Sequence, residues 1–462
     1  MHLPPPASLI TEPLNVLLAL MPLALAPPTR ICTRQDHFAP HPDAPFEGYY
    51  TRVQTAGGAT ILLIFSSVFA ATDKPHFVHF SYIPHSGSTS GSNQWRQQRI
   101  VVNKFPRITD TSGPQHADGG VHEFSRVAKG DGVEGTLRVC RDQQRYRLEF
   151  DLDSAQAADV AGRGGVEATG LVVSVDLTRR RPWHARDELS TPEGALAQLV
   201  HLLPLHWNVF STASTAAYSV TLGDRVLSAG TGIAHMEKNW GASFPRGWTW
   251  VQGFSVPTHS TPTTSTYSNS TSSSTAPEGG YHEARTLVMA GGKTLGQKAY
   301  LVGYRGGTAG GELSYGPPWT LMPFCRETPF VAETHDFSRG TARVRVGSLR
   351  HRLVVEVQAP PPAAVDADAA GHSGQWLGLH CPLADGHART LAYESFEGSV
   401  RVRVYRRSLW SLLLSLLSPL LLLVGGGGRG SSGWQLVEET MFDGAAVEFG
   451  GDYCVKARRD EQ

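Results

Sequence analysis

The chain has 462 residues, which is too long for one small hydrophobic core and predicts two domains. Its 41 basic and 41 acidic residues balance to a formal net charge of zero, so we expect no nucleic-acid partner. The 49 glycines and 30 prolines, with few long amphipathic patterns, favour an all-β protein with many turns. The five cysteines are scattered without C-x-x-C spacing, so neither a metal site nor a disulfide framework is predicted.

Residues 1–36 are predicted to form a disordered or leader segment. Their apolar stretch, residues 16–26, follows no lysine or arginine and therefore lacks the charged start of a secretory signal. No other targeting signal assigns the chain to a compartment.

Period-two alternation and β-branched residues predict strands through most of the remaining chain. The predicted strands are residues 47–54, 60–69, 77–82, 135–140, 146–152, 171–177, 285–289, 299–304, 342–346, 353–357, 399–405, 434–440 and 445–449. One short helix is predicted after Thr191, because Pro192 suits a first helical position.

The strands predict two lipocalin-like barrel or sandwich domains in tandem, residues 37–240 and 241–457. Within the second, residues 257–280 are rich in Ser, Thr and Pro and predict a disordered insertion. A leucine-rich insertion covers residues 408–432. Its apolar part, Leu409–Val424, is shorter than the ~20 residues of a membrane-spanning helix. It is expected either to rest on a membrane or lipid-droplet surface or to pack on its own protein.

The densest group of reactive and aromatic residues is the segment 234–252, AHMEKNWGASFPRGWTWVQ. A buried acid beside large aromatic faces can protonate an alkene and shelter the resulting carbocation. Glu237 is the first candidate for that acid, because burial among tryptophans disfavours its anion. Trp248 and Trp250 share one face of a predicted strand and form either an aromatic wall or core packing.

The same region resembles the tocopherol cyclase family. The matching pieces are His206-Trp207, E-K-N-W-G at 237–241, F-P at 244–245 and W-x-W-V-Q at 248–252. F-E-G-Y-Y at 46–50 and A-A-V-E-F-G-G at 445–451 extend the likeness, although Tyr49 stands where the family usually has Trp. The resemblance implies a lipocalin-like fold and a cofactor-free isomerisation. A prenylated phenol or quinol closes its own chroman ring after its double bond is protonated.

The candidate catalytic residues follow from these patterns. Glu47 is the second candidate acid, because it lies among aromatic residues. Lys238 could hold a phenolate, and Asn239 or His235 could orient the phenol or accept its proton. Glu237 and Lys238, as neighbours on a strand, are expected to face opposite sides. Glu448 is interpreted as structural, beside Gly450 and Gly451 at the end of a strand. The candidate substrate-binding residues are Tyr49, Trp207, Trp240, Trp248, Trp250 and Gln252.

Two other functions fit the same sequence. One is a lipocalin-like carrier of lipids or isoprenoids that has a pocket without chemistry. The other is a hydratase or a pericyclic cyclase of natural-product biosynthesis on the same scaffold. In all cases we expect a hydrophobic small-molecule ligand and no bound cofactor.

Overall fold

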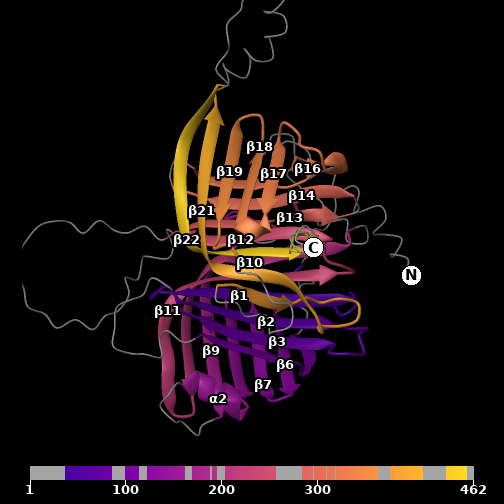
Figure 1. Ribbon diagram of the computed structural model, residues 1–462, viewed down its shortest axis with the longest axis vertical. Coiled ribbons are helices and arrows are strands. Elements are labelled where there is room, and N and C mark those ends of the chain that lie inside the picture. The colour runs from indigo at the N-terminus through magenta and orange to yellow at the C-terminus, as the bar shows by residue number, and fades with distance from the viewer. Residues whose placement is uncertain are drawn as a thin grey trace, which may run out of the picture.

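The computed structural model describes residues 37–85, 99–113, 122–161, 169–187, 190–194, 203–255, 284–294, 296–307, 310–317, 319–362, 375–408 and 433–454. Over these residues the protein is nearly all β, with two large antiparallel sheets stacked along the long axis (Figure 1). The predicted fold class, all-β with two lipocalin-like domains in tandem, is confirmed. The described residues contain no helix long and apolar enough to cross a membrane.

The first sheet has the strand order β4-β3-β2-β1-β11-β10-β9-β8-β7-β6-β5 over the described residues. Its strands are β1 (Phe46–Thr55), β2 (Thr60–Val68), β3 (His76–Ile83), β4 (Ile100–Lys104), β5 (Arg107–Ser112), β6 (Glu123–Gly130), β7 (Val133–Cys140), β8 (Gln144–Asp151), β9 (Gly170–Arg181), β10 (Leu205–Leu222) and β11 (Arg225–Gly241). The two edge strands, β4 and β5, are separated by only two residues of chain. The sheet must therefore curl until its edges approach each other.

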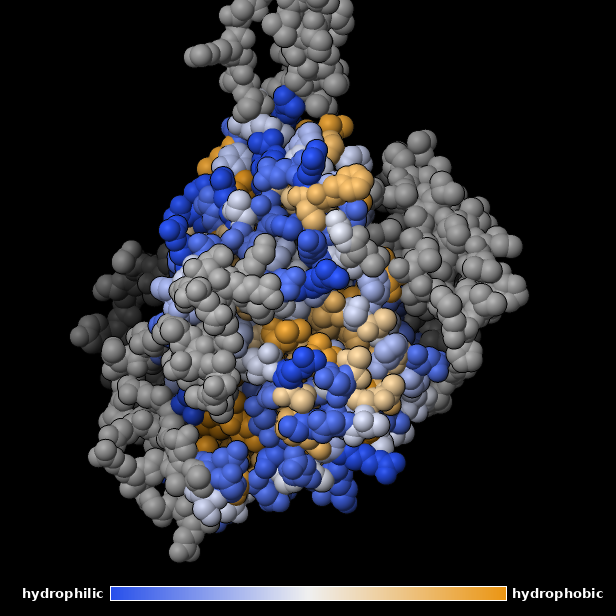
Figure 2. Space-filling model, turned by 45° about the vertical axis from the view of Figure 1, so that its right-hand side comes forward, coloured by the Kyte–Doolittle hydropathy of each residue, from blue (hydrophilic) through white to orange (hydrophobic). Residues whose placement is uncertain are grey.

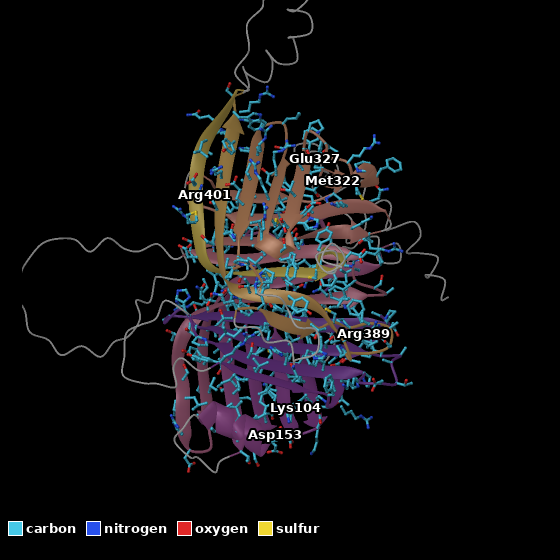
Figure 3. All side chains as sticks on the ribbon, in the orientation of Figure 1. Lys104, Asp153, Met322, Glu327, Arg389 and Arg401 are labelled. Atoms are coloured by element: carbon cyan, nitrogen blue, oxygen red, sulfur yellow. The ribbon has the colours of Figure 1, made fainter. Side chains whose placement is uncertain are left out.

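Helix α2 (Ser154–Ala161) lies at the far end of the first sheet (Figures 1 and 3). Asp153, labelled in Figure 3, caps the helix, because its Oδ1 accepts a hydrogen bond from the Gln156 N–H at 2.7 Å. The sequence patterns did not predict this helix.

The second sheet has the order β15-β14-β13-β12-β22-β21-β19-β18-β17, with β16 paired to β14 and β20 paired to β21. Its strands are β12 (Gly247–Ser255), β13 (Arg285–Thr294), β14 (Gln297–Arg305), β15 (Glu312–Tyr315), β16 (Leu321–Met322), β17 (Val331–Asp336), β18 (Thr341–Gly347), β19 (His351–Gln358), β20 (Leu377–His380), β21 (Thr390–Arg407) and β22 (Trp434–Gly451). Two 3₁₀ turns, η4 (Pro323–Cys325) and η5 (Phe337–Arg339), flank β17. The chain passes from the first sheet to the second between Gly241 and Gly247.

Three hydrophobic clusters show how the sheets pack. One lies inside the first sheet and one inside the second. The third joins residues of both sheets, among them Trp207 of β10, Trp250 of β12 and Leu62 of β2. The central strands β1, β11 and β12 are thus buried on both faces, one toward their own core and one toward the other sheet.

A loop of the second sheet reaches across to the first. The His387 N–H donates to the Lys74 carbonyl at 3.1 Å, and His387 Nε2 lies 2.9 Å from Ser66 Oγ. Burial lowers the pKa of His387 to about 4, so its ring is neutral in this contact. Arg389, at the end of the loop, lies beside the first sheet in Figure 3. The loop fixes the two sheets together at the edge of their interface.

Every predicted strand lies within an observed strand or extends at most one residue beyond its end. Residues 434–440 and 445–449 belong to one continuous strand, β22, rather than two. Several observed strands are absent from the predicted ranges, namely β4, β5, β6, β10, β11, β12, β15, β16, β17 and β20. In the long strands β10 and β11 a mixture of small, polar and aromatic residues gives little alternation. The predicted leader 1–36, the insertion 257–280, the apolar segment Leu409–Val424 and most of the predicted helix after Thr191 lie outside the described residues. The predicted domain bounds stay a prediction.

Candidate active site

A cavity of about 540 Å³ lies between the two sheets. Strands β1, β2 and β11 of the first sheet and β12, β13, β14 and β22 of the second contribute to its wall. The wall is mainly apolar, with Phe46, Ile64, Leu205, Phe244 and Leu321 among its residues. The surface of the molecule also shows apolar residues at mid-height, where the sheets meet (Figure 2). A cavity of this size and character suits a hydrophobic small molecule.

Strand alternation decides which candidate residues reach this cavity. On β11, Glu237 and Asn239 border the cavity. Lys238, between them, points to the other face, where its Nζ lies 3.0 Å from Glu47 Oε1. The expectation that Glu237 and Lys238 face opposite sides of the strand is met.

Glu237 is 4% exposed, and two nitrogen atoms lie within hydrogen-bond distance of one of its carboxyl oxygens. Its Oε2 accepts from Trp250 Nε1 at 3.1 Å and lies 2.8 Å from His235 Nε2. With its proton on Nε2, His235 is the second donor. These two hydrogen bonds leave the other carboxyl oxygen of Glu237 available to a ligand, and the role of Glu237 as an acid stays a prediction.

A second acidic residue at the cavity is Glu448, which we interpreted from the sequence as structural. It lies on β22, borders the cavity, and accepts a hydrogen bond on Oε1 from Trp248 Nε1 at 2.5 Å. Burial raises the pKa of Glu448 to about 7, and the negative charge of Glu237 adds to the rise, against the opposing effect of the Trp248 hydrogen bond. Glu448 therefore carries a proton in a large share of molecules at neutral pH.

A third carboxyl, Glu394 on β21, lies behind Glu448. The two residues are directly paired across β21 and β22, so both side chains leave the same face of the sheet. Glu394 is fully buried, and its Oε1 accepts the Tyr50 hydroxyl at 2.5 Å. Burial, with the charges of Glu448 and Glu237, raises the pKa of Glu394 well above the usual range. Burial therefore favours the protonated form of Glu394.

Aromatic rings surround these acids. The Trp250 ring lies edge-on to Tyr50 with centroids 5.0 Å apart, and Trp248 lies 5.2 Å from Phe244. Trp207 also borders the cavity and packs edge-on against Trp183 at 5.9 Å. Of the predicted aromatic wall, Trp207, Trp248 and Trp250 are brought together.

Other predicted site residues lie elsewhere. Glu47 and Lys238 form a fully buried ion pair on the far side of the first sheet, and neither borders the cavity. Burial alone would raise the pKa of Glu47, but Lys238, the His41 hydrogen bond and Arg126 hold it far below the usual range. Glu47 is therefore a buried anion, which cannot donate a proton at neutral pH.

Trp240 stacks on His41, with centroids 4.2 Å apart, on the same far side. Tyr49 touches the cavity lining, but its ring packs in the first core 5.6 Å from Phe124. Gln252 shares the interface face of β12, where its Oε1 accepts from Arg52 Nη1 at 2.5 Å, outside the cavity wall. Among the predicted aromatic and amide residues, these three do not form the wall around the acids.

No group of three His, Cys, Asp or Glu side chains suited to a metal ion occurs among the described residues. No family model and no curated protein matches the chain.

Several solved structures are similar at low identity. CghA in complex with Sch210972 has a TM-score of 0.43 and 9% identity over 88% of each chain. An AttH protein from Nitrosomonas europaea has a TM-score of 0.42 and 12% identity over 92% of this chain and 98% of that one. Kievitone hydratase from Nectria haematococca has a TM-score of 0.33 and 8% identity over 88% of this chain and 89% of that one. These likenesses are too distant to assign an activity.

Proposed function

We propose that the protein is a cofactor-free enzyme that protonates the double bond of a prenylated phenol or quinol and closes a chroman ring. The observation that carries the proposal is the raised pKa of Glu448, about 7, on the wall of an apolar cavity. The negative charge of Glu237 contributes to this rise. Two carboxyl groups in opposite protonation states at one site can serve as acid and base.

In the proposed first step, Glu448 donates its proton to the alkene. The carboxyl O–H bond breaks, a C–H bond forms, and positive charge remains on the tertiary carbon of the prenyl chain. An alkene is a weak base, so the donor must be protonated at working pH and the site must be poor in water. The mainly apolar wall supports the second condition.

The carbocation would be sheltered by aromatic rings that cannot add to it easily. Trp248 and Trp250 offer π faces or edges around the acids, and each cation–π contact is worth ~0.5–2 kcal/mol. The negative charge of Glu237 stabilises the same cation over a longer range.

In the second step the phenol oxygen attacks the cation, forming the C–O bond of the ring. The phenol proton passes to Glu237, whose two donors, Trp250 and His235, suit it to wait as an anion. Asn239 borders the cavity and can orient the phenol. Atoms balance without a cofactor, because the product is an isomer of the substrate.

The test is incubation of the purified protein with a panel of prenyl hydroquinones, with chroman formation followed by mass spectrometry. We expect a product of unchanged mass, and we expect Glu448→Gln to abolish its formation while the protein stays folded. A product heavier by one water, labelled from ¹⁸O-water, would instead indicate hydration. Binding of the quinols without any product in the native protein would indicate a carrier.

A further inference from the structure

One turnover of the proposed reaction leaves the two acids in the wrong states. Glu448 has lost its proton, and Glu237 has gained one. The site must return a proton from Glu237 to Glu448 before it can act again. The following inference rests on the proposed function and concerns how this reset occurs.

We propose that Tyr50 and Glu394 carry the proton from Glu237 back to Glu448 along a path inside the sheet interface. The path follows residues that are neighbours across paired strands and one hydrogen bond between the two sheets. Tyr50 and Glu237 are directly paired across β1 and β11, so their Cβ atoms are about 5 Å apart and their side chains leave the same face. The Tyr50 hydroxyl then bridges to the second sheet, 2.5 Å from Glu394 Oε1.

The path leaves Glu394 through its second carboxyl oxygen, Oε2. Its Oε2 is buried and has no hydrogen-bond partner among the described residues. A buried polar atom left without a partner costs free energy, so its retention calls for an explanation. Glu448, the direct cross-strand neighbour, is the group to which a proton on Oε2 can pass.

The proton balance closes without water from outside. Glu237 gives its proton to the Tyr50 oxygen as the Tyr50 hydroxyl proton passes to Glu394 Oε1. The proton that Glu394 held on Oε2 passes to Glu448. Tyr50 and Glu394 end as a phenol and a carboxylic acid, as they began, while Glu237 is again ionised and Glu448 again protonated.

The charges around Glu394 suit this role. Burial, the charges of Glu448 and Glu237, and the opposing charge of Arg52 together leave the pKa of Glu394 well above the usual range, which favours its protonated form. Burial also raises the pKa of Tyr50, so its hydroxyl passes a proton on only when it receives another. Both residues act through Glu448 and are positioning residues rather than proton donors to the substrate.

The test separates the first turnover from later ones by rapid quenching, with a geranylgeranyl hydroquinone as the probe. In Tyr50→Phe and Glu394→Gln we expect the first turnover per enzyme at nearly the native rate and later turnovers slowed about ten-fold or more. Tyr146→Phe is the matched control, because its buried hydroxyl contacts Thr51 at 2.7 Å inside the first core. In the control variant both the first turnover and the later turnovers should proceed at the native rate.

Equal slowing of the first and later turnovers in both variants, or no slowing, would overturn the relay. A second measurement does not depend on catalysis. The carboxyl band of Glu448, identified by its loss in Glu448→Gln, is followed by infrared spectroscopy after mixing into D₂O. Tyr50→Phe should slow its exchange about ten-fold, and unchanged exchange would refute the path. If the native protein forms no chroman, the proposed cyclisation fails while the infrared result still decides the relay.

Discussion

The indole N–H of Trp250, on the second sheet, donates a hydrogen bond to Glu237, on the first, at 3.1 Å. The next tryptophan on the same face of β12, Trp248, donates in the same way to Glu448. One strand thus sets the positions of both acids through two side chains spaced by two residues. The proposed reaction would therefore depend on how the sheets are packed against each other.

The rate should depend on pH through Glu448. Because its pKa is raised to about 7 and the proposed reaction needs its protonated form, kcat/KM should fall about ten-fold per pH unit above that value. The measurement is a pH–rate profile with a prenyl hydroquinone. A rate that stays constant from pH 6 to pH 9 would exclude Glu448 as the proton donor.

The same group should shape the pH dependence of stability. Its pKa is higher in the folded protein than its usual value of 4.5, so the folded state binds the proton more tightly. The free energy of unfolding should therefore fall by up to about 3 kcal/mol as pH rises from 4.5 to 7. Chemical denaturation of the native protein and Glu448→Gln should show this slope in the first and a flatter one in the second.

Trp250→Phe should reduce turnover about ten-fold, because it removes the donor to Glu237 and keeps a ring. Trp207→Phe is the matched control. Trp207 also borders the cavity, but its indole nitrogen has no hydrogen-bond partner among the described residues. Steady-state kinetics should show the loss in the first variant only. Equal losses would mean that ring shape, and not the hydrogen bond, matters.

Glu47→Gln should destabilise the protein by ~3–5 kcal/mol, because it leaves Lys238 buried without its carboxylate. The double variant Glu47→Gln, Lys238→Met should recover part of this loss, since the buried ammonium group is then removed as well. Denaturant unfolding gives both values. A stable but inactive Glu47→Gln protein would return Glu47 to the reaction mechanism.

A lipophilic tertiary amine shaped like the prenyl cation should bind the cavity and inhibit. Its ammonium group would interact with Glu237 and with ionised Glu448, so binding should strengthen as pH rises through about 7, opposite to catalysis. Calorimetry across this range checks the trend. Loss of affinity in Trp248→Leu with no loss in Trp240→Leu would place the amine in the cavity, since Trp240 lies on the far side.

Sequence patterns were sufficient for the class of fold and for part of the site. Alternation predicted strands because most of them bury one face, and the motif at 237–252 contains Glu237, Trp248 and Trp250. Alternation could not tell which face of β1 and β11 reaches the cavity, because both faces are buried. Glu47 and Trp240 were therefore included although they face the opposite side.

Glu448, Glu394 and Tyr50 were missed for a different reason. Glu394 and Glu448 are paired across β21 and β22, and they come near Glu237, roughly 150 to 200 residues away in the chain, only because the second sheet packs on the first. A local signal does exist, since Glu448 stands between Val447 and Phe449 on a buried strand. A carboxyl group inside an apolar strand is expensive unless it is paired or functional, and that reasoning could have selected it.

The two sheets each have a hydrophobic core of their own, and the cavity lies mainly between the faces that the sheets turn toward each other. Residues at this seam can therefore be exchanged without loosening either core. Adaptation to a longer, shorter or more polar ligand would then require little compensation in folding stability. The residues at the interface can therefore change to suit a new reaction while the fold stays the same.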